Sequence, residues 1–173
     1  MKKVIIYGSH YGTTKRYAEK LAEMTGISVI SSEAVKDLSV YGEVIHFGGL
    51  YAGGVNGLKN TVKLLPNNAK LIIVTVGLAD VTKQENTEHI KKAISQQISK
   101  DIFDKAQILH LRGGIDYSRL SFVHKMMMSF LYKKIKNTPE KQQTQEEREL
   151  IQTYNQKVDF VDFSSLQKIV DTL

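Results

Sequence analysis

The stretch Ile5-Ile6-Tyr7-Gly8-Ser9-His10-Tyr11-Gly12-Thr13-Thr14 decides the fold of this chain. It opens with a short run of aliphatic and aromatic side chains, which predicts a buried strand ending at Gly8. Ala18 and Leu21 then recur at helical spacing, which predicts a helix from about Thr13. The loop between the two elements therefore lies at the carboxyl edge of a sheet, where the first backbone N–H groups of the helix can bind an anion.

This loop has the composition of a phosphate site. Hydroxyl groups at Ser9, Thr13 and Thr14 add neutral donors, and Gly12 lets the backbone close around a phosphate. The alternative is an ordinary strand-to-helix turn with a threonine cap, which spacing alone leaves open. Two other nucleotide motifs are excluded, because the chain has neither the Walker pattern nor the three spaced glycines of the dinucleotide motif.

Similar strand signals recur along the chain and alternate with helical patterns. We predict strands at residues 4–8, 27–31, 44–48, 71–76 and 106–111. We predict helices at residues 13–24, 57–65, 87–98 and 163–170, while residues 33–38 fit either a short helix or a turn. This alternation, with the loop after the first strand, indicates a doubly wound α/β fold, a five-stranded parallel sheet in the order 2-1-3-4-5 with helices on both faces.

The length and composition favour one soluble globular domain. The chain has 173 residues, and we expect a single domain over residues 1–173. It has no cysteine, which excludes disulfides, thiolate metal sites and a cysteine nucleophile. No stretch reaches the roughly 18 to 20 apolar residues of a membrane-spanning helix, and the opening apolar run is too short for a signal peptide. We therefore expect a cytoplasmic protein.

The chain between residues 117 and 155 does not fit the alternation. We predict that it is an insert between the fifth strand and the last helix. Its first part carries an apolar and basic helix at about residues 122–136, and residues 138–149 are polar apart from one proline, which indicates a surface segment. Thr144 followed by Glu147 matches a capping box, so we expect a second helix from there toward Tyr154.

With these elements assigned, residues 5–21 resemble the flavodoxin signature. That signature has two aliphatic residues, an aromatic, a hydroxyl residue, a small residue, a threonine, and later an alanine and an aliphatic. The matching residues here are Ile5, Ile6, Tyr7, Ser9, Gly12, Thr14, Ala18 and Leu21. In flavodoxins this loop binds the phosphate of FMN. The resemblance thus implies FMN as the cofactor and a phosphate-binding role for Ser9, His10, Tyr11, Gly12, Thr13 and Thr14.

The resemblance also implies that two further loops flank the flavin ring. One contains Leu50, Tyr51, Ala52 and Gly53, and the other contains Gly77, Leu78, Ala79 and Asp80. Both follow strands, at the edge where doubly wound sheets bind ligands. Tyr51 is our candidate for stacking on the ring, with an ordinary loop tyrosine as the alternative. The second loop has no aromatic residue, unlike typical flavodoxins, which argues against an aromatic sandwich on both sides of the ring.

The region after the fifth strand resembles the flavodoxin-type, menaquinone-dependent protoporphyrinogen oxidases of bacteria. The resemblance lies in residues 111–120, in the Met-rich basic helix that follows, and in Val161-Asp162-Phe163. It implies cofactor contacts at Gly114 and Tyr117. It also implies an oxidoreductase that passes electrons from an organic substrate through FMN to an acceptor such as a quinone. Because the flavin takes up the electrons, we assign no catalytic side chain.

Two other functions fit the same fold. The first is a flavodoxin used as an electron carrier, although flavodoxins are acidic and the net charge of +6 argues against the same docking chemistry. The second is a non-enzymatic domain that binds a partner through its basic face. We predict no nucleic-acid partner. We also predict no metal site, because the five histidines have no ligand spacing and no clustered carboxylates accompany them.

The predicted helix at residues 122–136 is amphipathic. Its apolar arc holds Phe122, Val123, Met126, Met127, Phe130 and Leu131, with Lys133 and Lys134 inside the arc at the last turn. Lys125, Ser129 and Lys136 lie opposite. We expect the arc to pack on the domain or on a second copy of the chain. The alternative is a peripheral contact with an anionic membrane at its inner face, or a cover over a hydrophobic substrate.

Overall fold

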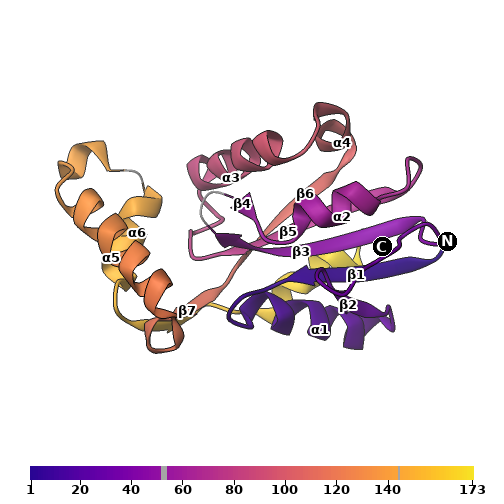
Figure 1. The fold of residues 1–173 in the computed structure, drawn as a ribbon, viewed down its shortest axis with the longest axis horizontal. Coiled ribbons are helices and arrows are strands. Elements are labelled where there is room, and N and C mark those ends of the chain that lie inside the picture. The colour runs from indigo at the N-terminus through magenta and orange to yellow at the C-terminus, as the bar shows by residue number, and fades with distance from the viewer. Residues whose placement is uncertain (52–53, 144) are drawn as a thin grey trace.

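The computed structural model describes residues 1–51, 54–143 and 145–173. Its main sheet confirms the predicted topology (Figure 1). The parallel strands are β1 (Lys3–Gly8), β2 (Val29–Ser31), β3 (Glu43–Tyr51), β5 (Lys70–Gly77) and β6 (Gln107–Arg112), in the order β2-β1-β3-β5-β6. These are the five predicted strands in the expected order. A short strand that we did not predict, β4 (Gly54–Val55), pairs antiparallel with the end of β3.

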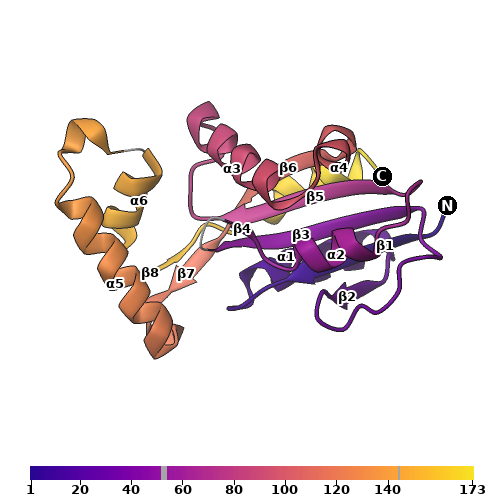
Figure 2. The ribbon, with the colours of Figure 1, turned by 45° about the horizontal axis from the view of Figure 1, so that its top comes forward.

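Helices cover both faces of the sheet, as predicted (Figure 2). One face carries α1 (Thr13–Thr25), the 3₁₀ turn η3 (Phe163–Leu166) and α7 (Gln167–Val170), and the other carries α2 (Leu58–Leu64), α3 (Gln84–Gln97) and α4 (Lys100–Lys105). Helix α4 was not predicted, because six residues are too few to show a helical period. Two ion pairs at i,i+4 spacing, Lys100–Asp104 and Lys105–Asp101, support it. Residues 33–38 form no helix and begin in a turn.

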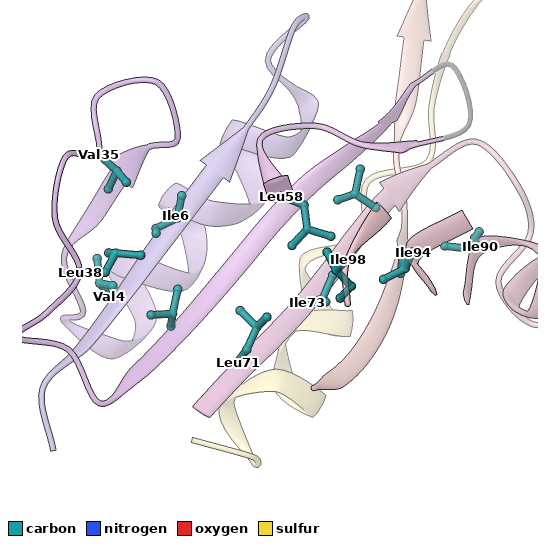
Figure 3. Close-up of a cluster of buried hydrophobic side chains, with 12 residues drawn as sticks. Val4, Ile6, Val35, Leu38, Leu58, Leu71, Ile73, Ile90, Ile94 and Ile98 are labelled. Atoms are coloured by element: carbon teal, nitrogen blue, oxygen red, sulfur yellow. The ribbon is translucent and has the colours of Figure 1, made fainter. Parts of the chain in front are cut away.

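Alternate side chains of the central strands enter two separate cores. In β1, Val4 and Ile6 pack toward α2 and α3, whereas Ile5 packs toward α1. Figure 3 shows the first of these cores, in which Leu71 and Ile73 of β5 share the space with Val4 and Ile6. Burial on both sides explains the nearly continuous aliphatic runs that predicted the strands. Because β1, β3 and β5 pair in parallel, their carboxyl ends lie at one edge of the sheet.

After β6 the chain leaves the sheet on a two-stranded antiparallel ribbon, β7 (Gly114–Asp116) with β8 (Lys157–Asp159). Between these strands lie η1 (Tyr117–Arg119), α5 (Phe122–Lys136), η2 (Glu140–Gln142) and α6 (Gln145–Thr153). We call residues 117–155 the insert. It lies beyond the end of the sheet opposite both chain termini (Figure 1). Both predicted helices are present, and Thr144, expected to cap the second one, lies outside the described residues.

Four of the six residues in the apolar arc of α5 do not pack on the domain, so our expectation of core packing is wrong for this part of the arc. Phe122, Val123, Met126 and Phe130 are between 59% and 76% exposed. Of the fifteen residues of α5, all of them described, Ile135 alone is buried. The physical reason is that the ribbon holds α5 away from the two sheet faces, where other helices already cover the core.

Candidate functional site

The predicted phosphate loop joins β1 to α1 at the carboxyl edge of the sheet. Gly12 is the N-cap residue of α1 and has a φ of 94°, in the left-handed region that favours glycine. The Gly12 N–H donates to Oγ of Ser9 at 3.1 Å, which closes the loop. No side chain caps α1, and its first turn has no acidic residue. The first N–H groups of a thirteen-residue helix are therefore available to an anion.

Two glycines, which have no side chain, let this loop lie close to the hairpin of β3 and β4. A Cβ atom at Gly8 would lie 2.2 Å from the carbonyl oxygen of Asn56, and one at Gly49 would lie 3.0 Å from Oγ1 of the buried Thr14. Neither position leaves room for a larger residue. The two glycines thus bring the start of α1 and the end of β3 to one wall of the site.

A cavity of about 490 Å³ opens beside this wall, within the range of small-molecule and cofactor sites. Its lining is mostly apolar. Ten of the residues predicted from the sequence line it, namely Ser9, His10, Tyr11, Thr13, Thr14, Leu50, Gly77, Leu78, Ala79 and Gly114. The phosphate loop, the end of β3 and the loop after β5 are therefore brought together, as the sequence predicted.

The other predicted site residues lie elsewhere or outside the described part. Gly12 lines a hollow on the outer side of the loop, near Lys15 and Arg119. The carboxylate of Asp80 accepts hydrogen bonds from the side-chain hydroxyl and backbone N–H of Thr82, and these bonds lower its pKa. Ala52, Gly53 and the side chain of Tyr51 lie outside the described residues, so the stacking role of Tyr51 stays a prediction.

Tyr117 does not line the cavity but belongs to a cluster of three tyrosines inside the insert. Its ring meets that of Tyr154 edge to face at 5.3 Å, and Tyr154 stacks on Tyr132 at 3.9 Å. Burial raises the pKa of Tyr117 to about 12. We expected Tyr117 at the cofactor, whereas here its ring joins η1 to α5 and α6.

The insert supplies a wall of the cavity that the sequence did not reveal. Its contributing residues are Leu120, His124, Met127, Met128, Phe130, Leu131, Glu149 and Leu150. Residues missed nearer the sheet are Gly49, Asn56, Val76, Gly113 and Ile115. The helical period of residues 122–131 was visible in the sequence, but it gave no indication of which surface this helix would face.

Three hydrogen bonds connect the insert to the loops on either side of the cavity. The Tyr11 hydroxyl is hydrogen-bonded to Nδ1 of His124 and accepts from the backbone N–H of Ser121 at 3.4 Å, which joins the phosphate loop to the start of α5. The backbone N–H of Asp80 donates to Oε2 of the buried Glu149 at 2.9 Å, which joins the loop after β5 to α6. The insert thus contacts the phosphate loop and the loop after β5.

A buried histidine holds the hairpin behind the site. Nε2 of His46 donates to the Asn56 carbonyl at 2.9 Å, and its Nδ1 accepts from the Thr61 hydroxyl at 2.9 Å. Burial lowers the pKa of His46 to about 4. The ring is therefore neutral at pH 7, with its proton on Nε2. Because Asn56 lines the cavity, this neutral histidine positions one edge of the site.

No group of three or more histidine, cysteine, aspartate or glutamate side chains in the described residues could hold a metal ion. No helix in the same residues is long and apolar enough to cross a membrane.

Comparisons with known proteins point to one family. The family model described as a flavodoxin domain matches residues 4–143. A flavoprotein from Lactobacillus acidophilus, solved in complex with FMN, is 14% identical with a TM-score of 0.45, over 64% of this chain and 91% of that one. A flavodoxin from the domain Archaea is 14% identical with a TM-score of 0.40, over 65% of this chain and 85% of that one. A mutant flavodoxin from Pseudomonas aeruginosa is 17% identical with a TM-score of 0.39, over 65% of this chain and 84% of that one. No curated protein matches the sequence.

Proposed function

The chain belongs to the flavodoxin domain family, and from this membership we propose that it is a redox protein that binds FMN at the carboxyl edge of its sheet. FMN is the cofactor. The observation that carries the proposal is the apolar cavity of about 490 Å³ that extends from the phosphate loop to the insert. It has an anion-binding end at α1 and an apolar end at Leu50 and Leu78, and FMN has the same division between phosphate and ring.

The residues at the phosphate end fit a dianion. The uncapped N–H groups of α1 favour negative charge, and the hydroxyls of Ser9, Thr13 and Thr14 line the cavity beside them. Thr14 is buried, so a hydrogen bond from its hydroxyl to a phosphate oxygen would be shielded from water. We assign phosphate binding to these groups.

The residues at the other end fit a flat apolar ring. Leu50 and Leu78 come from the two loops predicted to flank the flavin, and Ile115 extends the apolar lining. A Cβ atom at Gly77 would lie 2.7 Å from Cδ1 of Leu50, so glycine lets the Leu50 side chain lie directly against the end of β5. When bound, FMN supplies electron or hydride transfer. The role of these side chains is to orient the ring and exclude water from it.

We further propose that the protein is an oxidoreductase acting on an apolar organic substrate, similar to the protoporphyrinogen oxidases, with an acceptor such as a quinone. The support is the wall contributed by the insert. Met127, Met128 and Leu131 face the same cavity as the predicted flavin loops, and methionines adapt well to irregular ligands. An electron carrier needs only an exposed flavin edge and has no use for such a wall.

A flavodoxin-type electron carrier is the second candidate, because the family match is equally consistent with it. The net charge of +6 makes docking on the basic patches that receive acidic flavodoxins unfavourable. A non-enzymatic domain that binds a partner through the same fold is the third candidate, and it requires neither a bound flavin nor turnover.

The first experiment identifies the cofactor. We expect the purified protein to be yellow and to release FMN on denaturation, one per chain. Purified protein without flavin, which also fails to bind added FMN in a titration, would contradict the redox proposal and favour the non-enzymatic candidate.

The second experiment separates enzyme from carrier. We expect the loaded protein to turn over protoporphyrinogen with a quinone as acceptor. Met128→Gln should lower turnover while FMN affinity stays unchanged, and Met24→Gln, on the far end of α1, should change neither. If the protein exchanges electrons with a reductase but turns over no apolar donor, the carrier function holds and the oxidoreductase proposal fails.

A further inference from the structure

Helix α5 has an outward face that is apolar and uncovered. The side chains of Phe122, Val123, Met126 and Phe130 are 76%, 69%, 59% and 73% exposed. They recur at the spacing of neighbouring turns, so they form one stripe along a helix of fifteen residues, about 22 Å long. We call these four residues the outer stripe. Contiguous apolar surface of this kind marks an interaction site.

The opposite side of α5 already has its contacts. His124, Met128 and Leu131 face the cavity, Tyr132 stacks on Tyr154, and Ile135 is buried. The outer stripe is therefore not needed to hold the helix in place. It is a second apolar surface beside the cavity wall, and Phe130, at its edge, also lines the cavity.

Basic residues surround the outer stripe. Residues 117–137 contain Arg119, Lys125, Lys133, Lys134 and Lys136 and no aspartate or glutamate. Among the described residues, none of these five forms an ion pair, unlike Lys100 and Lys105 on α4. Lys133 and Lys134 are exposed in the last turn, beside Phe130. Their long stems let the ammonium groups reach past an apolar surface to anions above it.

We propose that the outer stripe docks α5 in the plane of an anionic lipid surface, with its phenylalanines among the acyl chains and the surrounding lysines on the headgroups. A helix with exposed aromatic residues on one face and basic residues around it is of the type that binds at a membrane interface. Each lysine near an anionic leaflet adds to the affinity, and salt weakens that part. The docking needs no bound FMN, so it is independent of the redox proposal.

The charges favour lipid over the other occupants of this surface. In a symmetric dimer through the outer stripe, the basic residues of both copies would share one interface with no acid of residues 117–137 between them. A polyanion such as a nucleic acid would pair with the lysines but leave Phe122, Phe130 and Met126 in water. An anionic lipid surface satisfies both the charged and the apolar parts.

Vesicle sedimentation tests the docking. We expect the full chain to pellet with vesicles containing one-third phosphatidylglycerol at low salt, to be released at high salt, and to bind vesicles of phosphatidylcholine alone at least tenfold more weakly. Protein that stays in the supernatant with anionic vesicles at low salt would overturn the proposal. So would equal binding to both kinds of vesicle.

Two pairs of variants test the residues. Lys133→Glu with Lys134→Glu should weaken binding about thirtyfold or more, whereas Lys91→Glu with Lys92→Glu, a matched pair of adjacent exposed lysines on α3, should have a much smaller effect. Phe122→Ser with Phe130→Ser should weaken binding about tenfold for each residue, and Met24→Ser with Val40→Ser is the control for exposed apolar residues elsewhere. Equal effects of test and control pairs would contradict docking through α5.

A site-specific probe reports insertion directly. Because the chain has no cysteine, Met126→Cys and Met24→Cys each give one labelling position for an environment-sensitive fluorophore. The label at position 126 should shift to the blue and brighten on anionic vesicles, and the label at position 24 should not. A shift at position 126 that depends on protein concentration and occurs without lipid would show that a second copy covers the outer stripe, and would overturn the proposal.

Discussion

In the sheet domain, Ile5, Ile45 and Ile72 are completely buried, whereas in the insert four of the large apolar side chains of α5 are mostly exposed. The sheet domain is held by two extensive cores. The insert is held by the cluster of three tyrosines, the two-stranded ribbon and the hydrogen bonds of Tyr11 and Glu149. This difference indicates that one chain combines a rigid platform for the cofactor with a weakly anchored wall. Regions with few buried apolar contacts open at lower free energy than the core does.

The largest effect should come from the sheet core. Phe47 is completely buried, and Phe47→Ala should lower the free energy of unfolding by about 3–5 kcal/mol. Tyr154→Ala, which removes the central ring of the tyrosine cluster, should change global unfolding much less and instead speed hydrogen exchange in α5 and α6. Denaturant unfolding and exchange measured on both variants check this. Similar losses of global stability would show that the two regions unfold as one unit.

The second effect concerns pH and again belongs to the sheet domain. Burial lowers the pKa of His46 from 6.5 to about 4. Between these two pH values the unfolded state binds a proton on His46 more readily than the folded state does. The contribution of the neutral His46 to the free energy of unfolding is therefore complete above pH 6.5 and is lost as pH falls toward 4. Between about pH 7 and about pH 5 the loss should be about 2 kcal/mol.

Urea unfolding at the two pH values checks the histidine. His46→Gln lowers stability at both pH values, because it disturbs the contacts with Asn56 and Thr61, but it should flatten the pH dependence. His110, whose pKa burial also lowers to about 4, remains in both proteins and contributes equally. A pH dependence in His46→Gln as steep as that of the natural sequence would rule out His46 as its source.

The third effect is on the cofactor rather than on folding. Thr14→Ala removes a buried hydroxyl from the cavity and should weaken FMN about tenfold or more, because a hydrogen bond to a charged group contributes about 1.5–3 kcal/mol. Ser9→Ala should have a similar effect. Thr25→Ala, at the far end of the same helix, is the matched control, since its hydroxyl donates to the Leu21 carbonyl and accepts from the Ile27 N–H, away from the cavity. Unchanged affinity in both test variants would count against the phosphate assignment.

The same comparison explains how much of the molecule the sequence predicted. The strands were predictable because both of their faces are buried, so successive residues such as Val4, Ile5 and Ile6 must all be apolar. The phosphate loop was predictable because its residues are local to one strand, one loop and one helix. Helix α5 was also found, since its apolar period is local.

The position of α5 was not predictable, because it depends on contacts between residues distant in the chain. Tyr11 and His124 are 113 positions apart, and Asp80 and Glu149 are 69 apart. Nothing in the periodicity of either segment specifies such a pair. We expected the apolar arc to be buried because apolar residues usually are. The helical spacing of apolar residues shows which face of a helix is apolar, but it does not show which surface that face contacts. The cavity wall was missed for the same reason.

The smallest effect should come from a single contact between the two regions. Tyr11→Phe keeps the ring beside His124 but removes the hydroxyl that is hydrogen-bonded to Nδ1 of His124 and accepts from the Ser121 N–H. A neutral hydrogen bond contributes about 0.5–1.5 kcal/mol, so amide exchange in α5 should become about two- to tenfold faster while global unfolding is unchanged. Because Tyr11 also lines the cavity, FMN should dissociate faster by a similar factor. Tyr41→Phe, on the opposite side of the domain, is the control. If exchange in α5 and FMN release both stay at their original rates, the Tyr11 contact does not anchor the insert, and the tyrosine cluster and the ribbon must hold it without help from the phosphate loop.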